Sequence, residues 1–281
     1  MKKDTLLLFL FALIILQSCQ KEVSKENGGA SAAPSGTLLV RSVYKSGTDS
    51  SLTTYAYDGA RRLTTLNNSG TTSGAPYNTQ IKIVRNTSGI IQKMNIKSDQ
   101  FAQLGIDSLV YVVNYDLTTG RYKSKVFTVD FLVVVLKDST SYDYDASGKV
   151  IRDREFTDDG TAGGYEEVGK TEYTYAGNNI ATVKIFSYDV PSNTYTLNET
   201  DTYEYDAKTN ALQLGNEAFL LGDVSFYGAN NVSKLTINVP ADPASNQVHT
   251  TTYTYNSNNR PLIATVLMQP GGTTTTSFTY Q

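Results

Sequence analysis

The sequence contains a single histidine, His249, within the segment Gln247-Val-His249-Thr-Thr. A serine hydrolase needs a histidine that is oriented by a carboxylate and faces a serine, and the sequence lacks the G-x-S-x-G elbow that often carries such a serine. Imidazole is also an axial ligand of haem iron. We therefore expect His249 to be a partly exposed strand or loop residue, with ligation of a porphyrin-like cofactor as the functional alternative.

A cluster of carboxylates surrounds the glycine-rich segment 160–164. Its members are Asp153, Glu155, Asp158, Asp159, Glu166 and Glu167. Oxygen-rich loops can bind calcium, and paired acids can hydrolyse glycosides. The spacing matches no calcium loop, and acidic glycine-rich segments between strands are typical of solvated hairpin tips. We expect no metal site here and keep an envelope polysaccharide hydrolase as an alternative function.

Tyrosine is the third candidate for chemistry, because the chain has 20 tyrosines, 10 phenylalanines and no tryptophan. Rows of aromatic rings on a sheet can stack on glycans, on flat hydrophobic ligands or on a protein partner. The same rows can instead pack against their neighbours with the hydroxyls in water. If a ligand exists, we expect it on a concave tyrosine face formed by Tyr144, Tyr175, Tyr205, Tyr227 and Tyr255.

The residues with the clearest chemistry lie at the beginning of the chain. Lys2 and Lys3 precede an apolar run from Leu6 to Leu16, which has the layout of an export signal and is too short to span a bilayer. The following Leu16-Gln17-Ser18-Cys19 resembles the lipobox of bacterial lipoproteins. This resemblance implies a signal peptide over residues 1–18 and lipidation of Cys19, the only cysteine.

The next segment, residues 20–36, is polar and poor in large apolar groups, so residues 19–36 should form a lipidated flexible tether. The pair Lys21-Glu22 is similar to the charged signal that sends some Bacteroidetes-type lipoproteins to the cell surface, although an ordinary polar tether explains it equally well. Removing residues 1–18 deletes Lys2, Lys3 and Asp4 from 24 basic and 27 acidic residues, which leaves a net charge of −4. We expect no nucleic-acid partner, because such binding needs clustered Lys and Arg.

Positioning these residues requires regular elements, and a repeat supplies them. One pattern recurs about 22 to 31 residues apart: an aromatic residue, any residue, Tyr, then Asp or Asn, and a turn that contains Gly or Asn. Its copies start near residues 55, 83, 113, 142, 173, 203, 225, 253 and 278. In each copy the two rings share one strand face, and the Asp or Asn accepts a backbone hydrogen bond at the head of the turn. Gly89, Gly148 and Asn179 should take the left-handed conformation that returns the chain.

The fold class that follows is all-β. Residues 37–281 should form one antiparallel meander of eight consecutive hairpins and a closing strand, curled into an open or incomplete barrel. We expect Phe127–Leu136 to be the most buried strand, and we allow a helical turn only within Gln100–Ser108.

The repeat resembles the YD repeats of bacterial surface and toxin-delivery proteins, whose core is matched best by Tyr144-Asp145-Ala-Ser-Gly148-Lys149-Val150. The chain is also similar to Bacteroidetes-type lipoproteins of unknown function with tyrosine-rich repeats, some of which are linked to a porphyrin-like ligand. These resemblances imply an outer membrane lipoprotein, facing the periplasm or the cell surface, that is anchored to the membrane by its lipid.

Its function should be that of a non-catalytic binding or scaffold protein of the cell envelope. The alternatives are a binder of a small hydrophobic or porphyrin-like ligand and the hydrolase considered above.

Overall fold

A computed structural model of the chain describes residues 38–130, 135–158, 160, 164–212, 214–223 and 227–281. The signal peptide, Cys19 and the tether lie outside the described residues. The strands are β1 (Leu39–Ser46), β2 (Asp49–Tyr57), β3 (Leu63–Thr72), β4 (Ala75–Arg85), β5 (Ile91–Ser98), β6 (Leu109–Asp116), β7 (Arg121–Asp130), β8 (Val135–Tyr144), β9 (Val150–Asp158), β10 (Glu166–Ala176), β11 (Asn179–Asp189), β12 (Thr194–Thr209), β13 (Asn230–Asn238), β14 (Gln247–Tyr255), β15 (Pro261–Gln269) and β16 (Thr273–Tyr280). The helices are α2 (Asp99–Gln103), α3 (Glu217–Leu221) and the short 3₁₀ helix η2 (Pro243–Ser245).

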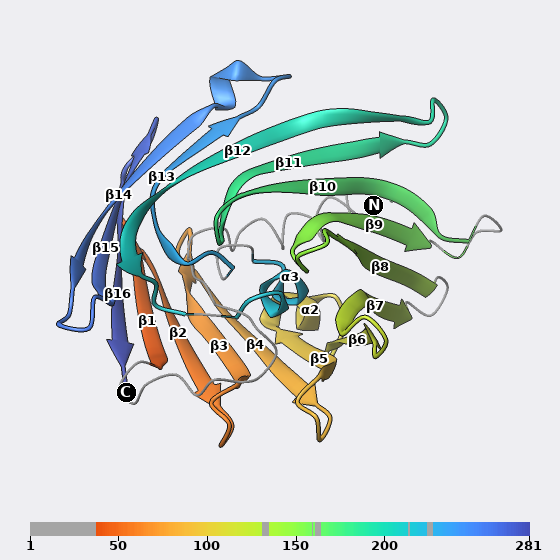
Figure 1. Ribbon diagram of the computed structural model, residues 1–281, viewed down its shortest axis with the longest axis horizontal. Helices are drawn as coiled ribbons and strands as arrows, with labels where there is room; N and C mark the ends of the chain where they lie inside the picture. Colours follow the sequence, from red (N-terminus) through yellow and green to blue (C-terminus); the bar gives the residue numbers. More distant parts are fainter. Residues whose placement is uncertain (1–37, 131–134, 159, 161–163, 213, 224–226) are drawn as a thin grey trace.

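These strands form one closed antiparallel barrel in which each strand pairs with its sequence neighbour and β1 pairs with β16 (Figure 1). The expectation of an open or incomplete barrel is therefore wrong. At the seam, the register runs from Leu39 opposite Tyr280 to Ser46 opposite Thr274. Closure gives backbone partners to the first and last strands, which would otherwise be two exposed edges.

The repeat occupies the even-numbered strands, whose C-terminal ends lie at one end of the barrel, which we call the turn end. The aspartates head the turns as expected. Asp58 Oδ1 accepts from the amides of Ala60 and Arg62, and Asp145 Oδ1 accepts from the amide of Lys149. Gly89 and Gly148 have φ values of 86° and 91°, so these two glycines take the expected left-handed conformation.

Three details of the expected meander are wrong. Asn179 does not take a left-handed conformation. The left-handed residue of that β-turn is Gly177, with φ 60°. The copy near 225 begins outside the described residues, and its described residues 227–229 form no strand but precede β13 as turn and bend. The segment Phe127–Leu136 is not one strand, because β7 ends at Asp130 and pairs with Val135 at the start of β8.

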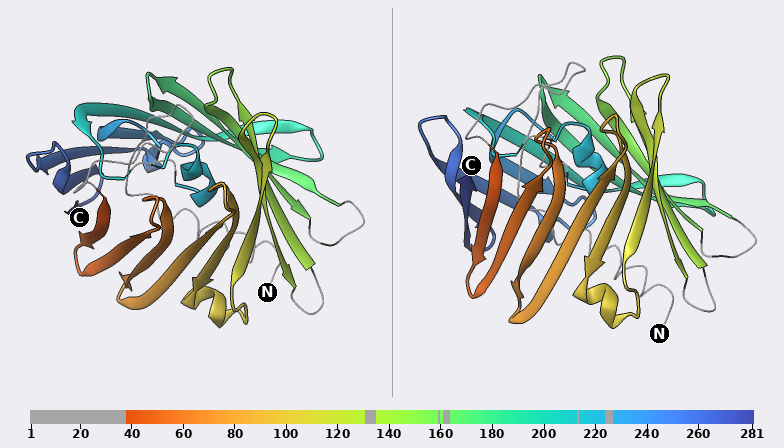
Figure 2. Two further views of the ribbon diagram at one scale, coloured as in Figure 1. Left: turned by 60° about the horizontal axis from the view of Figure 1, so that its bottom comes forward. Right: turned by 90° about the horizontal axis from the view of Figure 1, so that it is seen from below.

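Helix α2 begins one residue before the segment allowed for a helical turn and otherwise lies within it, but α3 was not expected. It belongs to the segment between β12 and β13, whose described residues, 210–212, 214–223 and 227–229, we call the plug. Figures 1 and 2 show α3 inside the barrel, between opposite walls. Its Ala218, Phe219 and Leu220 are 0%, 5% and 2% exposed. The plug therefore forms the centre of the hydrophobic core, together with inward tyrosines of the surrounding strands. None of the described helices is long and apolar enough to cross a membrane.

Candidate functional site

The interior of the barrel brings together most of the residues singled out from the sequence. Most repeat tyrosines point inward, and their hydroxyls bond to the barrel itself. Tyr57, Tyr144, Tyr175, Tyr205 and Tyr280 each donate to a backbone carbonyl at the start of the preceding odd-numbered strand. The acceptors are, in order, Leu39, Tyr122, Val150, Ile180 and Pro261. We call this recurring contact the tyrosine clamp.

A register shift next to the second tyrosine accompanies the clamp in β2, β8, β10 and β12. Such bulges re-aim a side chain at the end of a strand. The two rings of the motif consequently fill the turn end, while the residue between them faces outward. This placement gives the Tyr-x-Tyr motif a packing role that is repeated around the barrel.

The five tyrosines predicted to line a ligand site lie in this packed region. Tyr144, Tyr175 and Tyr205 are clamp residues, and Tyr255 donates to the carboxylate of Asp206. Tyr227 belongs to the plug and lies 5.3 Å from the ring of Tyr175. Each of the five thus has a partner within the protein, and their role in ligand binding stays a prediction.

The plug is anchored to the wall by polar contacts that come from distant strands. Arg85 on β4 donates to both carboxylate oxygens of Glu217, at 2.5 and 2.6 Å, and Arg85 is only 6% exposed. Asn216 Nδ2 donates to the carbonyl of Gly148 at 2.9 Å, and Arg260 donates to the carbonyl of Asn210. Because a buried arginine needs a partner, Glu217 ties the plug to the barrel.

Asn179 bonds to the C-terminal end of the plug. Its Oδ1 accepts from the amides of Ala229 and Asn230, and its Nδ2 donates to Asn230 Oδ1 at 3.0 Å. The residue expected to shape a turn therefore fixes the place where the chain leaves the interior and enters β13.

Charged side chains gather on the inward wall formed by β7, β8 and β9. Lys125, Asp138, Asp153 and Glu155 all face the interior and interact electrostatically. Desolvation by burial raises the pKa of Asp138 and of Asp153 to about 6. Burial, together with the neighbouring Asp153 and Asp138 carboxylates, raises the pKa of Glu155 to about 7. We call these four residues the buried charge cluster.

The carboxylates that the sequence places in one cluster thus lie on different faces of the barrel wall, because successive side chains of a strand point to opposite faces. Asp153 and Glu155 join the buried charge cluster. Asp158 pairs with Lys137 at 2.7 Å, and Glu167 accepts from Tyr195 at 2.5 Å. Asp159 lies outside the described residues. Among the residues described, no group of three or more His, Cys, Asp or Glu is placed to hold a metal ion.

His249 lies on β14, on the same strand face as Tyr253 and Tyr255. Its register neighbours are Leu235 on β13 and Met268 on β15. Its Nε2 lies 2.9 Å from Gln247 Oε1, and burial lowers its pKa. The histidine therefore faces the interior in an apolar setting, away from the carboxylates of the buried charge cluster on β8 and β9.

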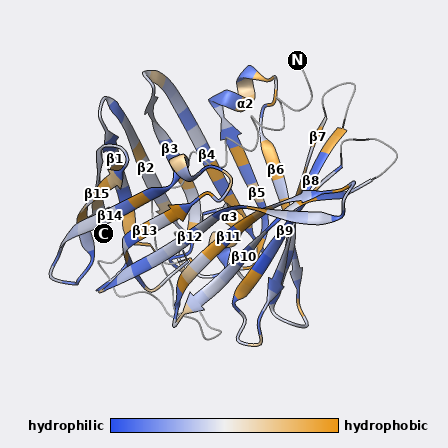
Figure 3. Ribbon diagram, turned by 90° about the horizontal axis from the view of Figure 1, so that it is seen from above, coloured by the Kyte–Doolittle hydropathy of each residue, from blue (hydrophilic) through white to orange (hydrophobic). Residues whose placement is uncertain are grey.

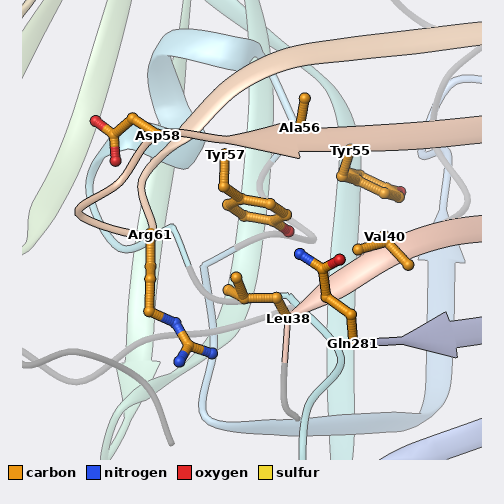
Figure 4. A pocket seen from close by; sticks show the side chains of 8 residues that line it. All are labelled: Leu38, Val40, Tyr55, Ala56, Tyr57, Asp58, Arg61 and Gln281. Atoms are coloured by element: carbon orange, nitrogen blue, oxygen red, sulfur yellow. The ribbon is translucent and has the colours of Figure 1, made fainter. Parts of the chain in front are cut away.

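A separate cavity of about 590 Å³ lies at the seam where the barrel closes. Figure 4 shows Tyr55, Tyr57, Leu38, Arg61 and Gln281 around it. Leu38 and Gln281 bond to each other through their backbones at 3.0 and 3.2 Å. The chain therefore enters the barrel beside this cavity, at the turn end.

Sequence reasoning did not identify Lys125, Asp138, Arg85 or Glu217. Lys125 and Asp138 occupy inward positions of strands whose side chains otherwise alternate between an inward and an outward face. A charged residue at an inward position is the sequence signal that could have identified them. Glu217 gives no comparable signal, because its partner Arg85 is 132 residues away.

No protein-family model matches the sequence, and no curated protein matches it either. The structure is similar to the crystal structure of a porin-like protein from Bacteroides uniformis ATCC 8492, with a TM-score of 0.53 and 14% identity over 88% of this chain and 99% of that chain. It is also similar to a porin-like protein from Bacteroides vulgatus ATCC 8482, with a TM-score of 0.52 and 11% identity over 87% of this chain and 99% of that chain. At these identities the likeness concerns architecture, and the chain shares the barrel fold of these two porin-like proteins.

Proposed function

We propose that this chain is a lipid-anchored protein of the cell envelope whose barrel stands outside the bilayer and serves as a non-catalytic binding or scaffold domain. The observation that carries the proposal is the polarity of the barrel: the interior at the turn end is apolar and aromatic, and charged side chains recur on the outward faces of the strands. A barrel that spans a membrane has the opposite arrangement, with an apolar band facing lipid.

The outward face of β8, β9 and β10 shows this polarity most clearly. Arg154 lies 2.9 Å from Asp143, Arg152 lies 3.5 Å from Glu172, and Lys170 lies 2.7 Å from Glu172. On β4 and β5, Lys82 and Lys93 alternate with buried Ile81, Ile83 and Met94. Figure 3 shows hydrophilic residues interspersed along the strands in this way. Arg and Lys on a lipid-facing surface cost about 2–4 kcal/mol each near the bilayer midplane.

The filled interior argues in the same direction. A pore needs a polar, open lumen, whereas the plug occupies the turn end with side chains that are almost fully buried. The tether would leave from Leu38 at that same end. A lipid on Cys19 would consequently attach the barrel to the membrane through the plugged end. The Bacteroides source of both porin-like proteins is in keeping with an envelope protein of the Bacteroidetes type.

The location is tested by separating membranes from soluble fractions in cells that express the full chain or its Cys19→Ala variant behind a non-lipoprotein signal peptide. We expect the parent in the membrane fraction and the variant in the soluble fraction without detergent. A variant that stays in the membrane and resists carbonate extraction would show that the barrel itself is inserted, and the proposal would be wrong.

A porphyrin-like ligand is the second candidate, and the placement of His249 favours it. The imidazole faces inward, burial favours its neutral form, and Leu235 and Met268 are its neighbours. Neutral imidazole is the form that ligates iron. Titration with haem should give a red-shifted Soret band that His249→Ala removes and Thr252→Ala, on the outer face of β14, preserves. An unshifted spectrum at micromolar protein rejects this ligand.

A further inference from the structure

The buried charge cluster lies where the plug meets the barrel wall. Thr140 on β8 pairs with Lys125 on β7 and with Glu155 on β9, which places the ammonium and the carboxyl group in one inward row. Asp138 lies two residues along β8, and Asp153 lies two residues along β9, on the same inward face. One cation and three carboxyl groups therefore share a small part of the interior.

Two residues of this wall, Lys125 and Tyr142, bond directly to the plug, and Asp153 reaches the plug through Tyr173 on β10. Lys125 Nζ donates to the carbonyl of Leu220 at 3.2 Å, and Tyr142 donates to the carbonyl of Phe219 at 3.2 Å. Tyr173 donates to Asp153 at 2.5 Å, while its ring packs against Phe219 at 5.0 Å. The seat of α3 thus includes groups whose charge varies with pH.

We propose that ionisation of the buried charge cluster controls how firmly the plug is seated, with α3 held in place in mildly acidic solution and loosened as the pH rises toward neutrality. When the carboxyl groups are protonated, Lys125 is free to bond to Leu220. When all three ionise, they exceed the single positive charge and compete with the Leu220 carbonyl for Lys125.

The sign follows from the pKa values. Asp138, Asp153 and Glu155 have pKa values raised to about 6 or 7 in the seated state, and they return toward ordinary carboxyl values once solvated. The seated state therefore binds more protons than the open state between about pH 4 and 7, and its stability falls across that window. Above the raised pKa values the loss is complete and the curve levels off.

Other titratable groups of the barrel interior set the background for this change. Asp201 on β12 has a pKa raised to about 7 by burial and by Glu199, so any solvation of Asp201 on opening would act with the same sign. Desolvation lowers the pKa of Lys125, which contributes with the opposite sign. Burial raises the pKa of Tyr111, Tyr122, Tyr142 and Tyr173, which keeps these hydroxyls neutral throughout the window. On the opposite wall, Arg85 pairs with Glu217. Asp223, just after α3, acts on Tyr55 and Tyr203.

A single fluorescent reporter can follow the plug, because the chain contains no tryptophan. We would place Leu221→Trp at the partly buried end of α3 in the full chain and record emission and acrylamide quenching from pH 4.5 to 8.5. We expect blue-shifted, protected emission at pH 5 and a red shift that levels off near pH 7.5. The opening constant should rise at least about tenfold, with unchanged far-UV circular dichroism.

A double variant, Asp138→Asn with Glu155→Gln, should flatten this pH profile. The matched control, Asp143→Asn with Glu172→Gln, removes two carboxylates from the outward face of the same region and should leave the profile unchanged. Should Leu221→Trp fail to fold, hydrogen-exchange protection of residues 214–223, corrected for intrinsic rates, measures the same opening in the parent. A flat parent profile, an unaltered profile in the double variant, or loss of circular dichroism in step with the emission would each overturn the proposal.

Discussion

The two halves of the barrel interior use inward-facing positions in opposite ways. At the turn end, tyrosine rings, aliphatic residues and the plug fill the space, and residues such as Leu63, Ile91 and Val150 are at most 1% exposed. From the edge of the plug toward α2 and η2, inward positions include Asp138, Glu155, Asp201 and His249, whose side chains are less fully buried. The difference indicates that the turn end supplies stability and that the opposite half is free to respond to solvent or ligand.

The polar groups of the two halves differ as well. At the turn end each tyrosine clamp satisfies a backbone carbonyl and needs no charge. Where the opposite half begins, at the edge of the plug, three carboxyl groups lie around Lys125, and their desolvation appears as raised pKa values. Substitutions at the turn end should therefore change the free energy of unfolding much more than substitutions in the opposite half.

The largest effect is expected from Phe219→Ala. Its ring lies 5.0 Å from Tyr173 and 5.2 Å from Tyr227, and removing it leaves a cavity in the middle of the plug. The free energy of unfolding should fall by about 3–5 kcal/mol. Urea denaturation measures it, with Leu117→Ala, at a side chain that is 83% exposed, as the control that should change by less than about 0.5 kcal/mol. Equal losses in the two variants would contradict a core role for the plug.

A somewhat smaller loss is expected from Glu217→Leu. This change leaves the Arg85 guanidinium buried without its carboxylate, which should cost about 3 kcal/mol. Adding Arg85→Leu should recover more than half of that loss, because the unpaired charge is removed. A double-mutant cycle by urea denaturation measures the coupling. Simple additivity of the two losses would show that the ion pair does not hold the plug.

The tyrosine clamp should contribute less per residue. Tyr144→Phe removes the donor to the Tyr122 carbonyl at 2.8 Å while keeping the ring, and should cost about 1 kcal/mol. Tyr195→Phe is the matched control, because Tyr195 is 39% exposed and bonds to a surface carboxylate. If both variants lose the same free energy of unfolding, the clamp has no special role.

The smallest effect is expected from His249→Gln in the opposite half. The side chain is partly buried and its one described hydrogen bond is to Gln247. Its replacement should change the free energy of unfolding by less than about 0.5 kcal/mol at pH 7. A loss as large as that of Phe219→Ala would erase the distinction between the halves.

Much of the local structure could be predicted from the sequence, because it depends on neighbouring residues. The Tyr-x-Tyr alternation, the Asp58 and Asp145 turns and the left-handed glycines at 89 and 148 follow from strand pleat and turn geometry alone. The prediction of a copy near 225 was wrong because the sequence Tyr-Gly-Ala-Asn-Asn matches the turn of the repeat. In the structure, Asn179 instead bonds to the amides of Ala229 and Asn230, where the plug ends. The apolar run after Phe127 misled because an uninterrupted run does not show where a hairpin turns.

The sequence by itself determined that the protein is an antiparallel meander with tyrosines on one face, since these properties arise from contacts between residues close along the chain. Only the tertiary structure decided that β1 meets β16, that the plug lies in the lumen, and that Lys125 lies among three carboxyl groups. Closure depends on the accumulated twist and stagger of all the strands, and the plug depends on pairs such as Arg85 and Glu217 that are far apart along the chain. Such long-range pairings leave no periodic signal in the sequence of either partner.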